Sequence, residues 1–223
     1  MAINTTEFNE IKKLTQQYHA GLIAVSKTKP NESILELYQQ GQRIFGENKV
    51  QELVAKFERL PKDIEWHLIG HLQSNKVKYI APFVALIHSV DSLNLLGEIN
   101  KQAQKNNRII SCLLQIYIAE EETKFGLNEK ELNELLESKT FQEMGNVQIC
   151  GLMGMATNTT NETQIEKEFQ HLKTIFENTK KQHFQTENLF KEISMGMSSD
   201  YKIALRNGAT FIRVGSLLFG ERS

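Results

Sequence analysis

Eight short apolar runs recur along this 223-residue sequence, and amphipathic stretches separate most of them. Such alternation is typical of a parallel sheet covered by helices. We predict strands over residues 21–26, 43–46, 65–70, 84–90, 110–118, 146–155, 190–196 and 210–215. Helices are predicted over residues 31–41, 47–59, 92–105, 129–138, 161–182 and 198–207, with an additional helix at about 4–18. The connection over 71–82 is too short to predict a full helix.

The apolar runs are nearly continuous, which indicates strands that are buried on both faces. A (β/α)8 barrel and an open doubly wound sheet both have such strands, and eight units favour the barrel. The three prolines lie at predicted element boundaries, and no linker or repeat divides the chain. We therefore expect an α/β fold over residues 1–223, a single-domain TIM barrel with an extra N-terminal helix.

Charge and composition exclude several classes of partner. The net charge is −1, so no overall attraction to nucleic acid or to anionic lipid is expected. The first 20 residues lack the apolar core of a signal peptide, and no later run could span a bilayer, so we expect a cytoplasmic location. Cys112 and Cys150 lie in apolar runs without metal-ligand spacing, which predicts reduced thiols and no metal. No surplus apolar face is evident, which favours a monomer.

The first predicted strand ends in two lysines, within LIAVSKTKP (22–30). In a barrel, the loops after the strands carry function. Alternation places Lys27 on the face of Ile23 and Val25, aimed into the barrel mouth. Lys29 has the same parity but lies further into the loop. A lysine between apolar side chains has a lowered pKa and can attack a carbonyl, whereas a lysine at the rim simply extends to solvent. Parity leaves both lysines open.

The loops after the last two predicted strands are rich in small polar residues. Ser198 and Ser199 precede a predicted helix, and Gly215 and Ser216 follow the eighth strand. These two loops are the common phosphate-binding position of barrel enzymes. An ordinary N-cap serine and a glycine turn are the alternative interpretation. The pairing of the two loops favours a phosphate site.

Arg213 shares a strand face with Phe211 and Gly215, toward the mouth. A buried arginine needs a partner, and a protein carboxylate and a ligand atom both satisfy that need. Asn48 and His67 lie near strand ends and could contact a bound ring, although a single buried histidine is more often a core residue. A reactive lysine opposite a phosphate site suits pyridoxal 5′-phosphate (PLP), and equally a sugar phosphate in a Schiff-base aldolase.

Eight motifs resemble, in order and spacing, those of the pyridoxal phosphate homeostasis protein family. They are AVSKTKP, FGENKVQE, WHLIGHLQSNK, HSVDS, KFG, GLMGMAT, SMGMSSD and IRVGSLLFG, and the resemblance covers about Gly21 to Arg222. That family is similar to the N-terminal barrel domain of alanine racemase, standing alone. Departures are few: Lys49 stands where many relatives have an aromatic residue, and the segment before the first strand is shorter.

The resemblance implies a role for each candidate residue. Lys27, the first lysine of SKTKP, would carry PLP as a Schiff base, and Arg213 would face the pyridine nitrogen. Ser198 and the backbone of Gly215 and Ser216 would bind the phosphate. The residues implied to line the pocket are Asn48, His67, Ser194 and Met197.

The resemblance leaves a choice between a carrier and an enzyme. A permanently charged guanidinium at the ring nitrogen opposes protonation of that nitrogen and weakens the ring as an electron sink. Racemases of this lineage also need a tyrosine from a C-terminal β-domain, and the sequence ends at Ser223. We therefore expect a PLP-binding protein of PLP homeostasis, with apo-enzymes that use PLP as transient partners. A weak amino-acid racemase is the main alternative, and the motif match disfavours the aldolase.

Overall fold

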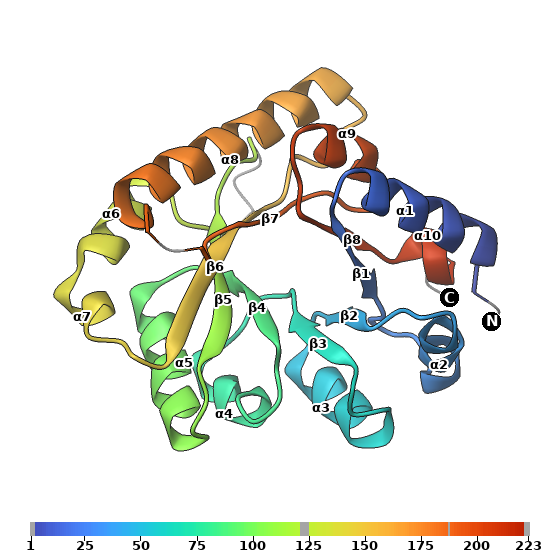
Figure 1. Cartoon of the computed structure of the whole chain (residues 1–223), viewed down its shortest axis with the longest axis horizontal. Coiled ribbons are helices and arrows are strands. Elements are labelled where there is room, and N and C mark those ends of the chain that lie inside the picture. Colours follow the sequence, from blue (N-terminus) through green and yellow to red (C-terminus); the bar gives the residue numbers. More distant parts are fainter. Residues whose placement is uncertain (1–2, 121–124, 187, 221–223) are drawn as a thin grey trace.

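The computed structural model describes residues 3–120, 125–186 and 188–220. Parallel strands close into a barrel in which each strand pairs with its neighbour in sequence and β8 pairs with β1 (Figure 1). The strands are β1 (Gly21–Val25), β2 (Ile44–Glu47), β3 (Glu65–Leu68), β4 (Leu86–Val90), β5 (Ile110–Ile116), β6 (Val147–Gly154), β7 (Glu192–Ser194) and β8 (Phe211–Val214). The prediction of a (β/α)8 barrel is confirmed.

Helices surround the barrel and cover the outer faces of the strands (Figure 1). They are α1 (Thr5–Gln17), α2 (Asn31–Gln39), α3 (Val50–Arg59), the 3₁₀ turn η1 (Ser74–Lys76), α4 (Val77–Ile80), α5 (Leu93–Lys105), α6 (Glu129–Glu137), α7 (Lys139–Gln142), α8 (Glu162–His183), α9 (Tyr201–Arg206) and α10 (Ser216–Phe219). Within the ranges given above, no helix is both long and apolar enough to cross a membrane.

The additional N-terminal helix is present as α1. The side chain of Asn4 caps it by accepting a hydrogen bond from the backbone N–H of Glu7, and Phe8 and Ile11 are buried on its inner face. The backbone N–H of Asn4 also donates to the carbonyl of Leu218, at 2.8 Å. This bond ties α1 to α10, so the two ends of the described chain lie side by side (Figure 1).

Several element boundaries differ from the sequence-based expectation. The helix predicted over 198–207 begins only at Tyr201, because residues 197–200 form a turn in which the Asp200 side chain accepts from the backbone N–H of Met197, at 2.6 Å. Residues 71–82 form η1 and one short helix, α4. The short helices α7 and α10 were not predicted from the sequence.

A β-bulge in β6 is a second difference from the predicted continuous strand. Cys112 of β5 pairs with Ile149, but the next residue, Leu113, pairs with Gly151. Cys150 is therefore the extra residue of the bulge. Gly151 has φ +152°, and a Cβ atom there would lie 1.8 Å from the carbonyl oxygen of Glu192, so only glycine fits.

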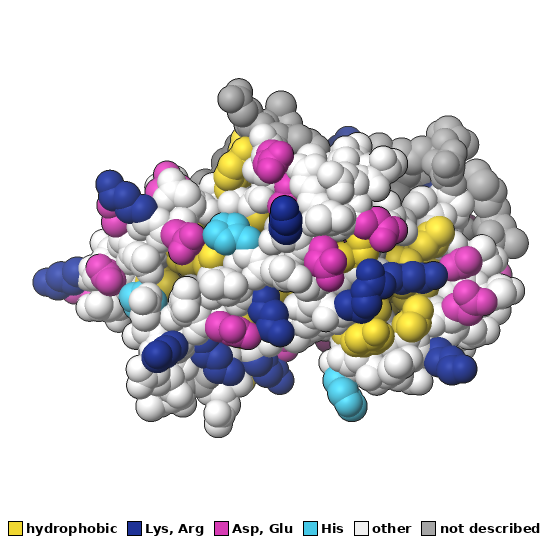
Figure 2. Space-filling model, turned by 90° about the horizontal axis from the view of Figure 1, so that it is seen from above, with side chains coloured by type: hydrophobic (Ala, Val, Ile, Leu, Met, Phe, Trp, Pro, Cys, Tyr) yellow, Lys and Arg dark blue, Asp and Glu magenta, His cyan; other side chains and the backbone are white. Residues whose placement is uncertain are grey.

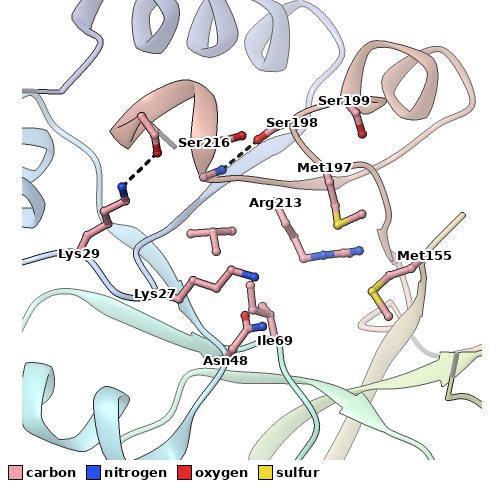
Figure 3. A pocket seen from close by; sticks show the side chains of 13 residues that line it. Lys27, Lys29, Asn48, Ile69, Met155, Met197, Ser198, Ser199, Arg213 and Ser216 are labelled. Atoms are coloured by element: carbon pink, nitrogen blue, oxygen red, sulfur yellow. Dashed lines mark hydrogen bonds between the residues drawn. The ribbon is translucent and has the colours of Figure 1, made fainter. Parts of the chain in front are cut away.

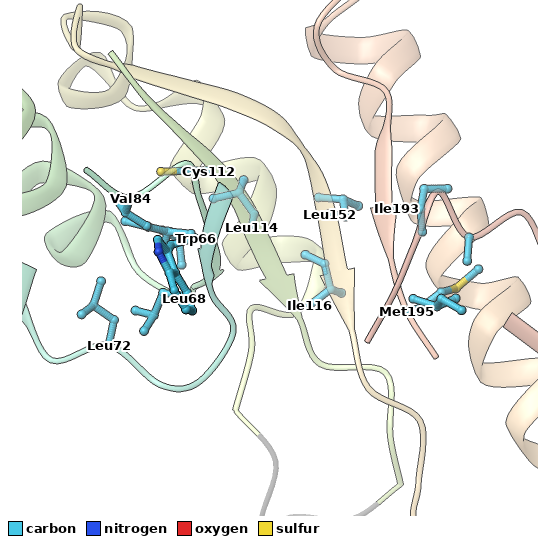
Figure 4. Close-up of a cluster of buried hydrophobic side chains, with 14 of the residues drawn as sticks. Trp66, Leu68, Leu72, Val84, Cys112, Leu114, Ile116, Leu152, Ile193 and Met195 are labelled. Carbon is cyan, nitrogen blue, oxygen red and sulfur yellow. The ribbon is translucent and has the colours of Figure 1, made fainter. Parts of the chain in front are cut away.

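Two different regions fill the barrel and its surroundings. The outer core lies between strands and helices and is apolar; Figure 4 shows part of it around Trp66, Cys112, Leu114 and Leu152. The barrel interior holds a smaller apolar cluster, with Leu86, Leu113 and Met153 packed against Cys150, Met155 and Phe211. Buried polar side chains complete the interior, namely His67, His88, Ser194 and Arg213. Both cysteines are free thiols, one in each region.

The outer surface carries charges of both signs. On the face that lies uppermost in Figure 1, Figure 2 shows lysine and arginine side chains interspersed with aspartate and glutamate. One pair on α8 joins Lys173 and Glu177, at 4.0 Å. The described side chains on this face form no extended field of one sign, consistent with the net charge of −1.

Candidate functional site at the barrel mouth

A cavity of about 390 Å³ opens at the C-terminal ends of the strands. Its lining comes from the ends of β1 and β8 and from the segments that follow β1, β2, β3, β6, β7 and β8, so residues far apart in the sequence meet there (Figure 3). The lining residues are Val25, Lys27, Lys29, Asn48, Ile69, Met155, Met197, Ser198, Ser199, Arg213, Gly215, Ser216 and Gly220. This is the end of a barrel at which binding and catalysis take place.

The structure separates the two lysines that parity left open. The Lys27 side chain extends into the cavity and ends near Asn48, with Arg213 opposite (Figure 3). The Lys29 amine instead donates to the carbonyls of Phe219 and Gly220, at 3.1 and 3.0 Å. Those carbonyls end α10, where a cation is favourable. Lys29 therefore fastens α10 to the first loop, while the Lys27 side chain points into the cavity.

Ser198 and Gly215 join the two loops on the opposite side of the cavity. The backbone N–H of Gly215 donates to the Ser198 hydroxyl oxygen, at 3.3 Å. Ser216, the first residue of α10, and Ser199 also line the cavity. A Cβ atom at position 215 would lie 3.1 Å from the carbonyl oxygen of Val25, so glycine lets β8 approach β1 closely here. The result is a patch of hydroxyl and backbone groups suited to an anion.

Arg213 lies on the cavity wall and is held from behind. Its guanidinium donates to the Ser194 hydroxyl oxygen at 2.6 Å and to the Gly154 carbonyl at 3.2 Å. Burial lowers the pKa of Arg213 to about 10, an effect that the Asp200 carboxylate partly opposes. The guanidinium therefore stays charged at neutral pH, with its orientation fixed by β6 and β7.

A chain of buried polar groups continues from Arg213 into the barrel interior. The Ser194 hydroxyl lies 2.9 Å from Nδ1 of His88, and Nε2 of His88 lies 3.0 Å from Nδ1 of His67. Burial lowers the pKa of His67 to about 3 and lowers that of His88 well below its usual value. Both imidazoles are therefore neutral at physiological pH.

Most of the residues selected from the sequence meet at this cavity, and two do not. Lys27, Asn48, Met197, Ser198, Arg213, Gly215 and Ser216 line it. His67 and Ser194 were expected to line the pocket but lie in the barrel interior, behind Arg213, with 3% and 0% of their surface exposed. His67 also packs edge-on against Phe211, at 5.7 Å between ring centroids. They are in a position to orient the wall of the cavity.

Sequence reasoning did not select several residues of this region. Met155 follows β6 and lines the cavity, and its parity with Met153 in GLMGM was a usable signal. Ile69 has the same parity as His67 and also lines the cavity. His88 connects Ser194 to His67, but alternation in LIHSV gives only its side of the strand and no indication of these partners.

Close approach of two backbones positions Asn48. A Cβ atom at position 70 would lie 2.4 Å from the carbonyl oxygen of Asn48, so Gly70 allows the segment after β3 to pack against the segment after β2. The Asn48 side chain, with the same parity as Gly46 inside the barrel, then reaches the cavity (Figure 3). It supplies an amide next to the Lys27 amine.

The charge of the lining selects for an anionic ligand. Lys27, Lys29 and Arg213 are basic residues, and no aspartate or glutamate is present among the described residues that line the cavity. Across the described part of the chain, no group of three or more His, Cys, Asp or Glu side chains is placed to hold a metal ion. An amine, a guanidinium and a hydroxyl-rich anion patch around one cavity suit a ligand with a carbonyl group and a phosphate.

Comparisons with known proteins identify the family to which the chain is similar. The family model described as "Alanine racemase, N-terminal domain" matches residues 5–223. A pyridoxal phosphate homeostasis protein of Aquifex aeolicus is 42% identical over 204 residues, covering 91% of this chain and 87% of that protein.

Solved structures show the same fold. PipY of Synechococcus elongatus, solved without PLP, superposes with a TM-score of 0.86 at 37% identity, covering 95% of this chain and 99% of PipY. A structure of PipY with PLP bound gives a TM-score of 0.83 at 37% identity, covering 96% of this chain and all of PipY. Alanine racemase of Bartonella henselae, at 17% identity, shares the fold with a TM-score of 0.68 over 96% of this chain and 58% of that protein.

Proposed function

Because this chain belongs to the alanine racemase N-terminal domain family and, within it, to the pyridoxal phosphate homeostasis proteins, we propose that it binds PLP and acts in PLP homeostasis. The observation that carries the proposal is the placement of the Lys27 amine across one cavity from Ser198, Gly215 and Ser216. PLP is both an aldehyde and a phosphate ester, so it complements both sides. In this proposal the chain binds, buffers and supplies PLP.

Lys27 is the residue we assign to covalent attachment. Its neutral amine would add to the aldehyde carbon of PLP, and one water would leave as the C=N bond of a Schiff base forms. Addition of water reverses the step and returns the amine and the aldehyde, so attachment allows release. When PLP is bound to an enzyme, it supplies an electron sink for amino-acid chemistry.

The other lining residues are assigned to recognition. Ser198, Ser216 and the backbone at Gly215 would bind the phosphate, and Asn48 and the sulfur-containing side chain of Met197 would contact the ring. Arg213, held by Ser194, would donate to the pyridine nitrogen. A guanidinium that stays charged opposes protonation of that nitrogen, so the site is better suited to holding PLP than to stabilising a carbanion.

The wider setting of the proposal is a monomer that acts in the cytoplasm as one PLP-binding domain. Apo-enzymes that use PLP are its transient partners, to which released PLP is transferred. Binding at Lys27 keeps the concentration of free aldehyde low, which protects other amines in the cell.

The central test is spectroscopic. Wild-type protein with added PLP should show the absorbance of a protonated Schiff base at about 410–430 nm. Lys27→Ala should lose this band, while Lys29→Ala, a matched change two residues away, should keep it at saturating PLP. A wild-type protein without the band, or a Lys27→Ala variant that keeps it, contradicts the assignment.

A second experiment separates the carrier from the racemase. Loaded protein is incubated with single L-amino acids in D₂O, and exchange of the α-proton is followed by NMR. In parallel, loaded protein is mixed with an apo-enzyme whose activity depends on PLP. We expect activation of the apo-enzyme without α-proton exchange. Rapid exchange, or loss of the L-configuration, would instead establish a racemase.

A further inference from the structure

A buried charged cluster lies directly behind the loop that carries Lys27, outside the cavity. Glu47 ends β2, and Glu52 and Lys56 lie on α3. The Lys56 amine donates to Oε1 of Glu47 and to Oε1 of Glu52, each at 2.7 Å. The Glu47 and Lys56 side chains are 0% and 6% exposed. We call these three residues the acidic clamp.

The acidic clamp holds the residues on both sides of Lys27. The Ser26 hydroxyl donates to Oε1 of Glu47 at 2.5 Å, and the Ser26 carbonyl accepts from the Lys56 amine at 2.7 Å. The backbone N–H of Thr28 donates to Oε1 of Glu52 at 2.5 Å. Lys27 itself extends to the other side, into the cavity. The backbone on either side of Lys27 is therefore fixed from behind.

The turn that the clamp holds is strained. The Lys29 N–H donates to the Ser26 carbonyl, which closes a turn with Lys27 and Thr28 at its centre. Thr28 has φ +65°, a conformation that β-branched residues rarely adopt. Such strain persists only where the surroundings enforce it, and here the carboxylate of Glu52 does so.

A contribution to stability is a weak explanation for the presence of the acidic clamp. Burying the Glu47 carboxylate and the Lys56 ammonium group costs solvation energy. The ion pair between them, and the pair of Lys56 with the 23% exposed Glu52 side chain, offset this cost only in part. All three Lys56 donors are used, but among the described residues Oε2 of Glu47 has no hydrogen-bond partner. Buried polar groups of this kind are best attested where they fix one conformation among several.

We propose that Glu47, Glu52 and Lys56 are positioning residues that hold the Ser26–Thr28 turn so that the Lys27 amine projects into the cavity. This inference rests on the proposed function in one respect, namely that PLP is the ligand that Lys27 binds. The hold on the turn is a property of the chain itself and can be measured without PLP.

The test compares two glutamates of the same helix. Glu52 contacts the turn, whereas Glu58, also on α3, is exposed. Glu52→Ala should lower the affinity for PLP, measured by the absorbance band, at least tenfold. Glu52→Gln, which keeps an acceptor for the Thr28 N–H but loses the charge, should have a smaller effect. Glu58→Gln, the matched control, should change the affinity less than twofold.

A second readout uses the chain without PLP. In Glu52→Ala, the backbone amides of residues 27–29 should exchange with D₂O at least tenfold faster, while those of β1 are unchanged. Adding Thr28→Gly, which adopts a positive φ without strain, should restore part of the lost PLP affinity. Rescue of the PLP affinity without a matching gain in the free energy of unfolding separates positioning from a simple loss of stability.

The outcomes separate the two proposals. If wild-type protein shows no PLP band, the proposed function fails, and amide exchange alone decides the role of the clamp. If wild-type protein shows the band but Glu52→Ala binds PLP equally well, or exchanges equally slowly at 27–29, the clamp is not a positioning device. The positioning role is also overturned if both Glu52→Ala and Glu52→Gln lower the fraction of folded protein and this decrease accounts for their loss of PLP affinity.

Discussion

The outer core and the barrel interior share the same eight strands but differ in chemistry. The outer core is a continuous apolar layer that includes Trp66 and Ile212. The interior has a small apolar cluster, and above it lie two histidines, a serine and an arginine. Alternating residues of one strand thus serve two ends: Trp66 of β3 packs outward, and His67, the next residue, faces inward. The difference indicates that the outer core contributes most of the stability, whereas the interior supports the candidate site.

The largest expected effect is on the outer core. Trp66 is 1% exposed, and its indole N–H has no hydrogen-bond partner among the described residues, so its contribution is packing. Trp66→Ala should lower the free energy of unfolding by about 3–5 kcal/mol, measured by urea denaturation. Trp66→Phe should cost less, because most of the ring volume remains. A cost below about 1 kcal/mol for the alanine variant would place the stability elsewhere.

Low pH should lower the stability of the protein through the buried histidines of the barrel interior. Since burial lowers the pKa of His67 to about 3 and that of His88 well below its usual value, the unfolded chain binds protons below about pH 6.5 that the folded chain does not. Stability should therefore fall as the pH drops from about 6.5, by up to about 1.4 kcal/mol per pH unit for each histidine. Burial raises the pKa of Glu47, which acts in the opposite sense.

Urea midpoints between pH 7.5 and 5 check this prediction. The comparison variant is His171→Gln, in which an exposed histidine of α8 is replaced. A slope near zero in the wild-type protein would mean that the interior histidines titrate freely, and the contrast with the outer core would lose its electrostatic basis.

A substitution of Ser194 should affect both the stability of the barrel interior and the binding of PLP, because Ser194 contacts both His88 and Arg213. Ser194→Ala removes the partner of Nδ1 of His88 and one of the two partners of the Arg213 guanidinium. We expect a loss of about 2–3 kcal/mol in the free energy of unfolding, because buried donors and acceptors lose a partner. PLP affinity should fall as well, by about tenfold. Unchanged affinity in a destabilised variant would show that Arg213 needs no support from behind.

The smallest effect comes from the same substitution on the two sides of the sheet. Cys112 is fully buried in the outer core, where Cys112→Ser places a hydroxyl among apolar groups at a cost of about 1–2 kcal/mol. Cys150, the bulge residue of the interior, is half-buried near Ser111, and Cys150→Ser should cost less than about 1 kcal/mol. Thermal unfolding of the two variants gives the comparison directly. Equal costs would contradict it.

Features with a local or periodic signature could be predicted from the sequence. The eight strands appear as apolar runs, and alternation placed Lys27 and Arg213 at the mouth. The bulge at Cys150 could not be predicted, because Gly151 is required by the approach of a residue 41 positions later, Glu192. The separation of Lys27 from Lys29 likewise depends on carbonyls at Phe219 and Gly220, about 190 residues away.

The buried chain behind Arg213 shows the same limit. Its members lie on β3, β4, β7 and β8, and the separation of His88 from Ser194 is 106 residues. Each residue gives a local signal that it faces inward, but which polar groups meet depends on the register of the closed barrel. The proposed roles of these residues toward PLP stay predictions until the variants above are measured.

Closure of the barrel between β1 and β8 brings together cavity residues that are synthesised at different times. Lys27 precedes Ser198, Arg213 and Ser216 by more than 170 residues, so it leaves the ribosome well before them. A nascent chain therefore has the amine long before it has the groups opposite. A ligand that contacts both sides spans the contact between β1 and β8, so its binding energy adds to the stability of the closed barrel. Saturation with ligand would then report that the barrel is closed.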